Sequence, residues 1–305
     1  MVLMKFSMNR KERFAAFACL CMLMLTASCT NLTAVREWSR TSLEASQFNG
    51  IVATYVDTPV RLKRYDKLRF EQYRRPTGEQ KRMFSLRQGL YDTNVTERRN
   101  QAEALKQILS VVSDYMGALA TLSADGTVDY SKHINTLNTE IGNLRAKHAD
   151  KRISASTLAA AGSIVQTLLK PWQAKQVNMM IRQANAPLQT ILAGELRQLV
   201  ANDFQNDLKT EGDMIDLYYD ALLDDGHPSS AAQDAVTEWR EVRREQNNAR
   251  LHAIAAYLSV LDNIAKGHQK LYDNRNRLDD TRLVSDLYLL VNDLRKQITI
   301  LTKSL

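Results

Sequence analysis

The sequence predicts an all-α fold, an elongated antiparallel bundle of long amphipathic helices. Apolar residues recur at steps of three and four through most of the chain, which is the period of one face of an α-helix. The 305 residues include only 5 prolines and 11 glycines, so long segments run without a helix breaker. No segment alternates apolar and polar residues over a useful length. Because long amphipathic helices need one another to bury their apolar faces, an antiparallel bundle follows.

The first 28 residues have the layout of a secretory signal peptide. Four basic residues come first: Lys5, Arg10, Lys11 and Arg13. An apolar run at 14–25 and three small residues follow. The run is shorter than the roughly 20 residues that cross a bilayer as a helix. We therefore expect removal of residues 1–28, which leaves 29–305 as one helical-bundle domain.

The stretch Leu25-Thr26-Ala27-Ser28-Cys29 follows directly and resembles a bacterial lipobox. The resemblance implies that a lipid is attached to the Cys29 thiol and that the chain is cut just before it. Thr30, in place of an aspartate, implies export to the outer membrane with the domain facing the periplasm. The alternative is ordinary signal-peptide cleavage that leaves a free thiol.

Cysteine usage and charge agree with an exported protein. Two of the 3 cysteines, Cys19 and Cys21, lie in the discarded segment, so the mature chain has no internal disulfide. The formal net charge is +7, of which the signal segment carries +3. The remaining excess of +4 gives no case for nucleic-acid binding. With 44% hydrophobic and 25% charged residues, the chain is neither disordered nor embedded in a membrane.

In chain order we expect helices near residues 31–57, 58–73, 79–123, 134–148, 158–165, 185–223, 229–267 and 281–301.

Proline and glycine set the boundaries of the first three helices. Thr58 and Pro59 end the first helix and restart the second, because a capping hydroxyl precedes a proline at the first helical position. The turn at 76–78 contains both proline and glycine, and the long helix after it ends before Gly126.

The middle segments differ in composition. Apolar residues at 134–148 alternate steps of three and four, as in a short coiled-coil seam. The stretch 158–165 consists mainly of small and apolar residues, so we expect it to be the central buried helix. Gln166 and Lys170 interrupt the apolar run, which disfavours a membrane helix.

Turn residues also define the last three helices. Pro187 starts a long helix, a polar loop at 224–229 ends it, and Gly267 is expected to stop the next helix. The stretch Asp279-Asp280-Thr281 is expected to cap the last helix. The surroundings of Tyr115 and Tyr257 match in spacing, which either reflects an internal duplication or ordinary helical periodicity.

No catalytic, cofactor or metal motif is present in the sequence. The five histidines do not lie three or four residues from one another: His133, His148, His227, His252 and His268. Glycine-rich phosphate loops and nucleophile motifs are also absent from the sequence. We therefore expect a protein without enzyme activity, cofactor or metal.

An acidic row lies on one face of the helix at 185–223 and its end: Asp213, Asp216, Asp220 and Asp224. A hairpin at 224–229 would bring Arg240, Arg243 and Arg244 beside it. We expect salt bridges between the two helices or solvation, rather than a catalytic or cation-binding site.

The strongest candidate contact site is a basic hairpin at 61–87, which carries ten basic and three acidic residues. Tyrosine and phenylalanine side chains are interleaved, as on surfaces that contact anionic groups or a partner protein. The candidate residues are Arg61, Arg64, Tyr65, Lys67, Arg69, Tyr73, Arg74, Arg75, Lys81 and Arg82. The alternative is a solvated tip with local salt bridges.

Taken together, these features predict a lipid-anchored envelope protein that acts by binding, in a structural, tethering or accessory role. Its partners would be the membrane, through the lipid, and an acidic protein, the carboxylates of the cell wall or anionic lipid headgroups. A small-ligand sensor or carrier with a pocket between helices is the alternative, as is an immunity lipoprotein that neutralises a toxin.

Overall fold

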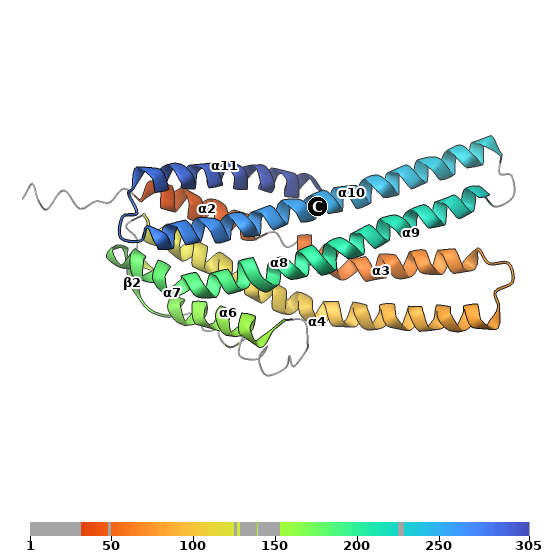
Figure 1. The fold of residues 1–305 in the computed structure, drawn as a ribbon, viewed down its shortest axis with the longest axis horizontal. Helices are drawn as coiled ribbons and strands as arrows, with labels where there is room; N and C mark the ends of the chain where they lie inside the picture. The colour runs from red at the N-terminus through yellow and green to blue at the C-terminus, as the bar shows by residue number, and fades with distance from the viewer. Residues whose placement is uncertain are drawn as a thin grey trace, which may run out of the picture.

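The computed structural model describes residues 32–47, 50–124, 127–128, 139, 153–224 and 229–304. These residues form an all-α, elongated, antiparallel bundle, as the sequence predicts (Figure 1). One short ladder occurs in the described part of the chain. There, β1 (Thr127–Val128) pairs antiparallel with β2 (Trp172–Gln173).

The described helices, in chain order, are α2 (Thr33–Ser46), α3 (Gly50–Glu71), α4 (Gly78–Leu122), α6 (Ala155–Leu168), the 3₁₀ turn η2 (Ala174–Gln176), α7 (Val177–Gln189), the π-helical η3 (Thr190–Glu195), α8 (Leu196–Gln198), the π-helical η4 (Leu199–Phe204), α9 (Gln205–Asp224), α10 (Ser230–Asp273) and α11 (Thr281–Ser304).

Four rods run along the molecule. α2 and α3 lead away from residue 32, α4 returns, the continuous segment from α7 to α9 leads out again, and α10 returns (Figure 1). α11 packs on α10 and α2, and α6 packs on α7 and α4. Because α6 and α11 flank the rods at one end only, the molecule has a broad end and a narrower end.

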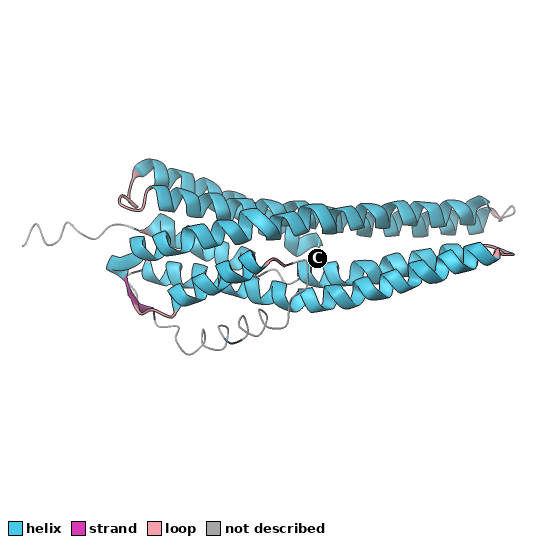
Figure 2. Ribbon diagram, turned by 60° about the horizontal axis from the view of Figure 1, so that its bottom comes forward, coloured by secondary structure: helices cyan, strands magenta, loops and turns pink. Residues whose placement is uncertain are grey.

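We call these two parts the broad end and the arm. The broad end comprises α2, α6, α7 and α11 with residues 101–122 and 251–273. The arm comprises residues 57–71 of α3, 209–224 of α9, 78–100 of α4 and 230–250 of α10. The start of α3, with Ile51, Val52 and Tyr55, packs in the core of the broad end. Within the arm the main contacts join α4 to α3, α3 to α9, and α9 to α10, and Figure 2 shows two helical hairpins side by side.

The two parts have different interiors. The broad end holds a large apolar core whose fully buried side chains include Trp38, Tyr115 and Leu168. The arm has a small separate cluster of Tyr65, Ile215 and Tyr219. Since burial of apolar surface contributes most of the folding free energy, the broad end is the more stable part.

The expected break at Thr58 and Pro59 is wrong, because α3 runs through both residues. A proline lacks the N–H that would bond the carbonyl four residues earlier, here that of Tyr55. Arg98 of α4 supplies the missing donor, with Nη1 3.2 Å from the Tyr55 oxygen. The Thr58 hydroxyl donates to the Thr54 carbonyl at 2.8 Å. A contact from another helix therefore keeps α3 continuous.

The expected stop at Gly267 is also wrong, because α10 continues to Asp273. The indole of Trp38, on α2, lies directly against this glycine. A Cβ at position 267 would lie 2.4 Å from Trp38 Cε2. Gly267 therefore serves the close packing of α2 on α10.

The expected helix start near Pro187 lies too late, because α7 already begins at Val177 and passes through the proline. Met180, Ile181 and Ala184 are fully buried. Their burial contributes several kcal/mol, which offsets the roughly 3 kcal/mol that an internal proline costs.

The stretch 158–165 lies in α6, which is not the central helix. α6 lies at the edge of the broad end and exposes Ser156, Ala159 and Ser163 (Figure 1). Its small residues fit against α7, with Ala161 fully buried.

Two further expectations from the sequence are confirmed, and a third concerns residues that the structure largely does not describe. The turn at 76–78 leads into α4 through a capping box between Thr77 and Gln80. The Asp280 carboxylate accepts from the Arg282 and Leu283 amides at the start of α11. The expected helix at 134–148 lies outside the described residues apart from Thr139, which is helical.

Gly267→Ala should lower the free energy of unfolding by about 1–3 kcal/mol, the usual cost of overpacking a filled core. Gly89→Ala is the matched control, because a Cβ there meets nothing within 4 Å and the residue lies inside α4. That change should stabilise by up to about 1 kcal/mol. Urea denaturation followed by circular dichroism measures both. Equal effects of the two changes would contradict the role of Trp38.

Arg98→Ala should cost about 2–4 kcal/mol, because it removes the donor to Tyr55 and leaves the Asp207 carboxylate without its ion-pair partner. In a Pro59→Ala background the helix regains its own donor, so the cost of Arg98→Ala should fall by about 1 kcal/mol. Urea denaturation of the four proteins in this cycle gives the coupling. The exposed Arg99→Ala is the control and should change stability by less than about 0.5 kcal/mol.

Candidate functional site

The end of α3 and the start of α4 form the tip of the arm. The rings of Phe70 and Phe84 stack with centroids 4.0 Å apart and join the two helices beside the turn. The turn itself, at 72–77, lies at the opposite end of the molecule from the start of α2 (Figure 1). The basic hairpin predicted from the sequence therefore occupies one end of the rod.

Two of the ten predicted contact residues are internal. Arg61 donates from Nε to Glu211 at 2.6 Å and from Nη2 to the Thr58 hydroxyl at 2.8 Å. Tyr65 is buried in the arm cluster, and burial raises the pKa of its phenol. Neither side chain is available at the surface in the way that the sequence pattern suggests.

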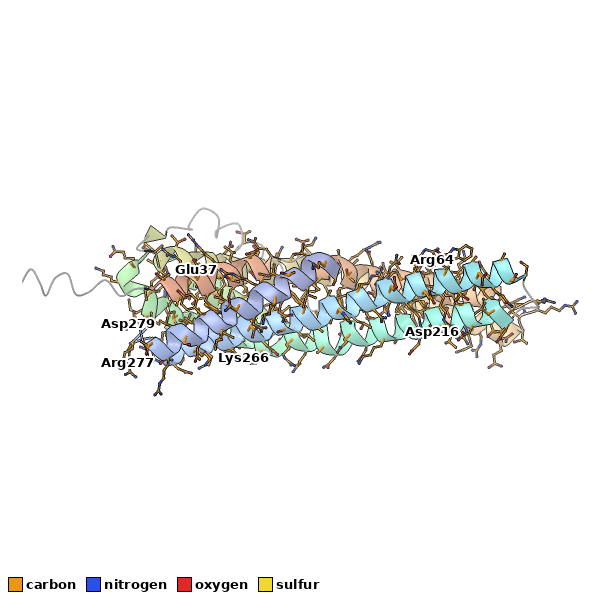
Figure 3. All side chains as sticks on the ribbon, turned by 90° about the horizontal axis from the view of Figure 1, so that it is seen from above. Glu37, Arg64, Asp216, Lys266, Arg277 and Asp279 are labelled. Carbon is orange, nitrogen blue, oxygen red and sulfur yellow. The ribbon has the colours of Figure 1, made fainter. Side chains whose placement is uncertain are left out.

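The other eight residues are exposed: Arg64, Lys67, Arg69, Tyr73, Arg74, Arg75, Lys81 and Arg82. Lys67 lies 3.7 Å from Glu71. Five cations make no ion pair with any residue that the structure describes: Arg64, Arg69, Arg75, Lys81 and Arg82. Figure 3 shows the side chains along the arm, where Arg64 and Asp216 are labelled. The tip is thus a cationic surface with an exposed Tyr73 ring.

A buried polar layer supports the arm behind the tip, and the sequence pattern did not predict it. The Glu211 side chain is only 1% exposed and accepts from Arg61 and from Arg250, the latter at 3.4 Å. Burial and the neighbouring Arg61 lower the pKa of Arg250. The Asn247 amide donates to the Leu208 carbonyl at 3.0 Å. The sequence does contain an indication of this buried polar layer, because Glu211 lies in an otherwise apolar row of α9.

An open groove of about 520 Å³ lies at the tip between α3 and α9. Arg69, Gln72 and Tyr73 line one wall. Leu217, Ala221 and two carboxylates of the acidic row line the other. The groove combines a guanidinium, a tyrosine ring and carboxylates. It can therefore contact both acidic and basic groups of a peptide or protein surface.

Two of the four carboxylates in the acidic row, Asp216 and Asp220, form the expected salt bridges between α9 and α10. Of the three expected partners, Arg240 and Arg244 take part, and Arg243 donates to Gln246 instead. Asp216 binds Arg244 at 2.6 Å and Arg240 at 3.2 Å, and Asp220 binds Arg240 at 2.8 Å. These partly exposed pairs hold the two helices in register and add little stability each.

Other cavities in the described residues suit a small ligand poorly. An apolar cavity between Tyr55, Leu105 and Tyr257 has a volume of only about 20 Å³. A polar cleft of about 610 Å³ lies beside the bend at Gly194. Its Glu195 carboxylate already accepts from the Ser154 amide and hydroxyl, both at 2.5 Å. Neither of these two cavities combines apolar walls with converging polar groups, as the pocket of a carrier would.

Among the described residues, no group of three or more histidine, cysteine, aspartate and glutamate side chains could hold a metal ion. Cys29, His133, His148 and His227 lie outside the described residues. No described helix is long and apolar enough to span a bilayer.

Comparison with known protein families, curated proteins and solved structures finds no match to this chain.

His268 is fully buried in the broad end, between two polar side chains. Its Nε2 lies 2.7 Å from the Tyr115 hydroxyl and its Nδ1 lies 2.9 Å from Asn185 Oδ1. Since the amide oxygen only accepts, Nδ1 carries the proton and Nε2 accepts from the tyrosine. Burial lowers the pKa of the imidazole to about 3. The neutral histidine therefore joins α4, α7 and α10 as a structural group.

This histidine predicts an acid-sensitive fold. The imidazole of the unfolded chain ionises near pH 6.5, so below that pH the unfolded state binds a proton that the folded state does not. The free energy of unfolding should fall by up to about 1.4 kcal/mol per pH unit between about pH 6 and pH 4 through this group. His268→Gln should remove that part of the slope in urea titrations.

Proposed function

We propose that this protein is a lipid-anchored component of the bacterial cell envelope that acts by binding. In this proposal a lipid on Cys29 holds the broad end at the outer membrane. The arm then presents the cationic tip to an acidic protein in the periplasm. The role is that of a tether or an accessory subunit, without enzyme activity or cofactor.

The observation that carries the proposal is the separation of the tip from the start of α2. α2 and α3 contain 14 and 22 residues and lead in one direction. At 1.5 Å per residue they span about 54 Å. An anchor placed before α2 would therefore leave the tip tens of ångströms from the membrane surface.

The charge at the tip supports binding to an anionic partner. Arg64, Arg69, Arg75, Lys81 and Arg82 lie on α3, α4 and the turn between them, and no described residue neutralises them through an ion pair. A cluster of like charges raises the association rate with an oppositely charged surface and makes binding sensitive to salt. Tyr73 adds an exposed ring, a residue type common at the centres of protein interfaces.

Photo-crosslinking in cells tests the proposal. The full chain carries a photoreactive phenylalanine derivative in place of Tyr73, or in place of Tyr288 on α11 as a control. Both tyrosines are exposed, with 46% and 41% of their surface accessible. We expect a discrete protein adduct from position 73 and none from position 288. A muropeptide adduct at position 73 would instead identify the cell wall as the partner.

Charge reversal separates electrostatic binding from incidental proximity. Arg75→Glu, Lys81→Glu and Arg82→Glu together should reduce the position-73 adduct at least tenfold. Arg282→Glu, Lys296→Glu and Lys303→Glu change the net charge equally on exposed sites of α11 and should leave the adduct unchanged. An adduct of equal yield in both variants would refute a charged contact at the tip. Loss of membrane association in Cys29→Ser, followed by fractionation, checks the anchor separately.

A further inference from the structure

The two helical hairpins of the arm carry opposite charge. Residues 57–100, which contain the hairpin of α3 and α4, include twelve basic and six acidic residues. Residues 209–250, which contain the hairpin of α9 and α10, include five basic and ten acidic residues. The hairpins lie side by side, and α3 packs on α9 (Figure 2). The line between these two helices therefore divides a positive half of the arm from a negative half.

The groove at the tip lies on this dividing line. Its volume of about 520 Å³ is ordinary for a ligand site. Arg69 lines the wall that belongs to the positive hairpin, and Asp224 lines the wall that belongs to the negative hairpin. Neither side chain makes an ion pair with a described residue, and they do not pair with each other. An unpaired cation and an unpaired carboxylate thus line opposite sides of one groove.

The neighbouring acidic groups of both walls are already paired within the protein. Glu71, beside the positive wall, lies 3.7 Å from Lys67. Asp220, in the negative wall, binds Arg240 at 2.8 Å. Among the described residues that line the groove, one guanidinium and one carboxylate are therefore left to pair with a ligand.

Contacts between the two walls define the groove before any ligand binds. Gln72 donates from Nε2 to the Tyr218 carbonyl at 3.2 Å and so links the turn to α9. The rings of Tyr65 and Tyr218 lie with centroids 6.2 Å apart and join α3 to α9. Tyr73 and Leu217, each nearly half exposed, add an apolar group to each wall. The groove therefore offers two opposite charges and apolar surface in one place.

This arrangement selects a ligand that carries both charges. A purely anionic ligand would meet Asp224 and the negative hairpin, and a purely cationic one would meet Arg69 and the positive hairpin, so like charges oppose both. From Leu217 to Asp224 the wall of α9 is about 10 Å long, the length of three to four residues of an extended chain. Successive side chains of such a chain point to opposite sides. Alternating acidic and basic residues would therefore give it one edge of each charge.

We infer that the groove at the tip binds an extended segment of the partner protein in which acidic and basic residues alternate. The acidic edge of the segment pairs with Arg69 and the basic edge pairs with Asp224. The inference rests on the proposed function, because it describes the part of the acidic protein that the tip contacts. The opposite charges of the two walls fix which edge of the segment faces which hairpin.

Two hexapeptides with blocked ends and equal composition serve as probes. Three glutamates and three lysines alternate in one, whereas the glutamates precede the lysines in the other. Six residues are too few for a stable helix, and both peptides have zero net charge, so only the pattern differs. We expect the alternating peptide to bind the full-length lipidated protein in detergent at least fivefold more tightly, measured by fluorescence anisotropy. Equal affinities, or no binding of the alternating peptide, would overturn the inference.

Free leucine distinguishes a peptide site from an amino-acid site. It carries an ammonium and a carboxylate group on one carbon beside an apolar side chain. We expect no displacement of the alternating peptide by leucine. Displacement would assign the groove to a zwitterionic amino acid and overturn the peptide inference.

Removal of the unpaired carboxylate tests the sign of the effect. Asp224→Asn makes the tip more cationic, so a partner recognised through positive charge alone would give more of the position-73 adduct. We expect the opposite, a loss of at least fivefold in both the adduct and the affinity for the alternating peptide. Asp213→Asn removes an exposed carboxylate of the acidic row outside the groove and should change neither.

Removal of the unpaired guanidinium gives the second half of the test. Arg69→Gln should weaken the alternating peptide at least fivefold. Arg99→Gln removes an exposed cation of α4 outside the groove and should leave the affinity unchanged. Equal affinities of the two variants would show that the positive wall does not contact the peptide.

The two proposals fail in different ways. If Asp224→Asn leaves the position-73 adduct at full yield or raises it, the tip contact stands and recognition of both charges is wrong. If position 73 yields no adduct in cells while anchoring is intact, the proposed function is wrong whatever the peptides do.

Discussion

The guanidinium of Arg98 joins three helices at the point where the broad end becomes the arm. It extends from α4 and donates to the Tyr55 carbonyl, to which Pro59 has no N–H to donate. It also lies 4.6 Å from the centre of the Tyr55 ring and pairs with Asp207 of α9. Because this side chain donates the hydrogen bond that the N–H of residue 59 would otherwise make, α3 continues through the proline. The length of the arm, and hence the distance of the tip from the start of α2, depends on that continuity.

Beyond this junction the interior becomes polar. The broad end has a large apolar core that also holds buried hydroxyl and amide side chains and one neutral histidine. The arm holds the charged Glu211 between Arg61 and Arg250 and places Asn247 between helices. Charged groups inside a thin layer of helices fix which side chains face one another, because an unpaired buried charge is costly. They contribute less stability than an apolar core of equal volume. The geometry of the arm is therefore well defined, while its stability is modest.

Three features could be predicted from the sequence: the all-α architecture, the turn at 76–78 and the salt bridges of Asp216 and Asp220. Each depends on the helical period of the apolar residues, on helix capping or on residues that lie close together in the sequence. The continuity of α3 and α10 could not. In both cases a residue distant in sequence decides the outcome, Arg98 for Pro59 and Trp38 for Gly267. The candidate site divides in the same way. Exposed cations of the turn follow from composition, whereas the internal roles of Arg61 and Tyr65 depend on Glu211 and Tyr219 of α9, which no pattern within 61–87 contains.

The unbroken passage of α4 and α10 through both parts of the molecule gives the arm the mechanical character of a lever. Neither helix has a joint at the junction, so a small rotation of the polar layer against the apolar core is transmitted along continuous hydrogen-bonded backbone. Residues 78–98 of α4 span about 31 Å, so a tilt of the whole arm by roughly ten degrees about its base would carry the tip about 5 Å sideways. A rod of this kind moves its far end much more than its base.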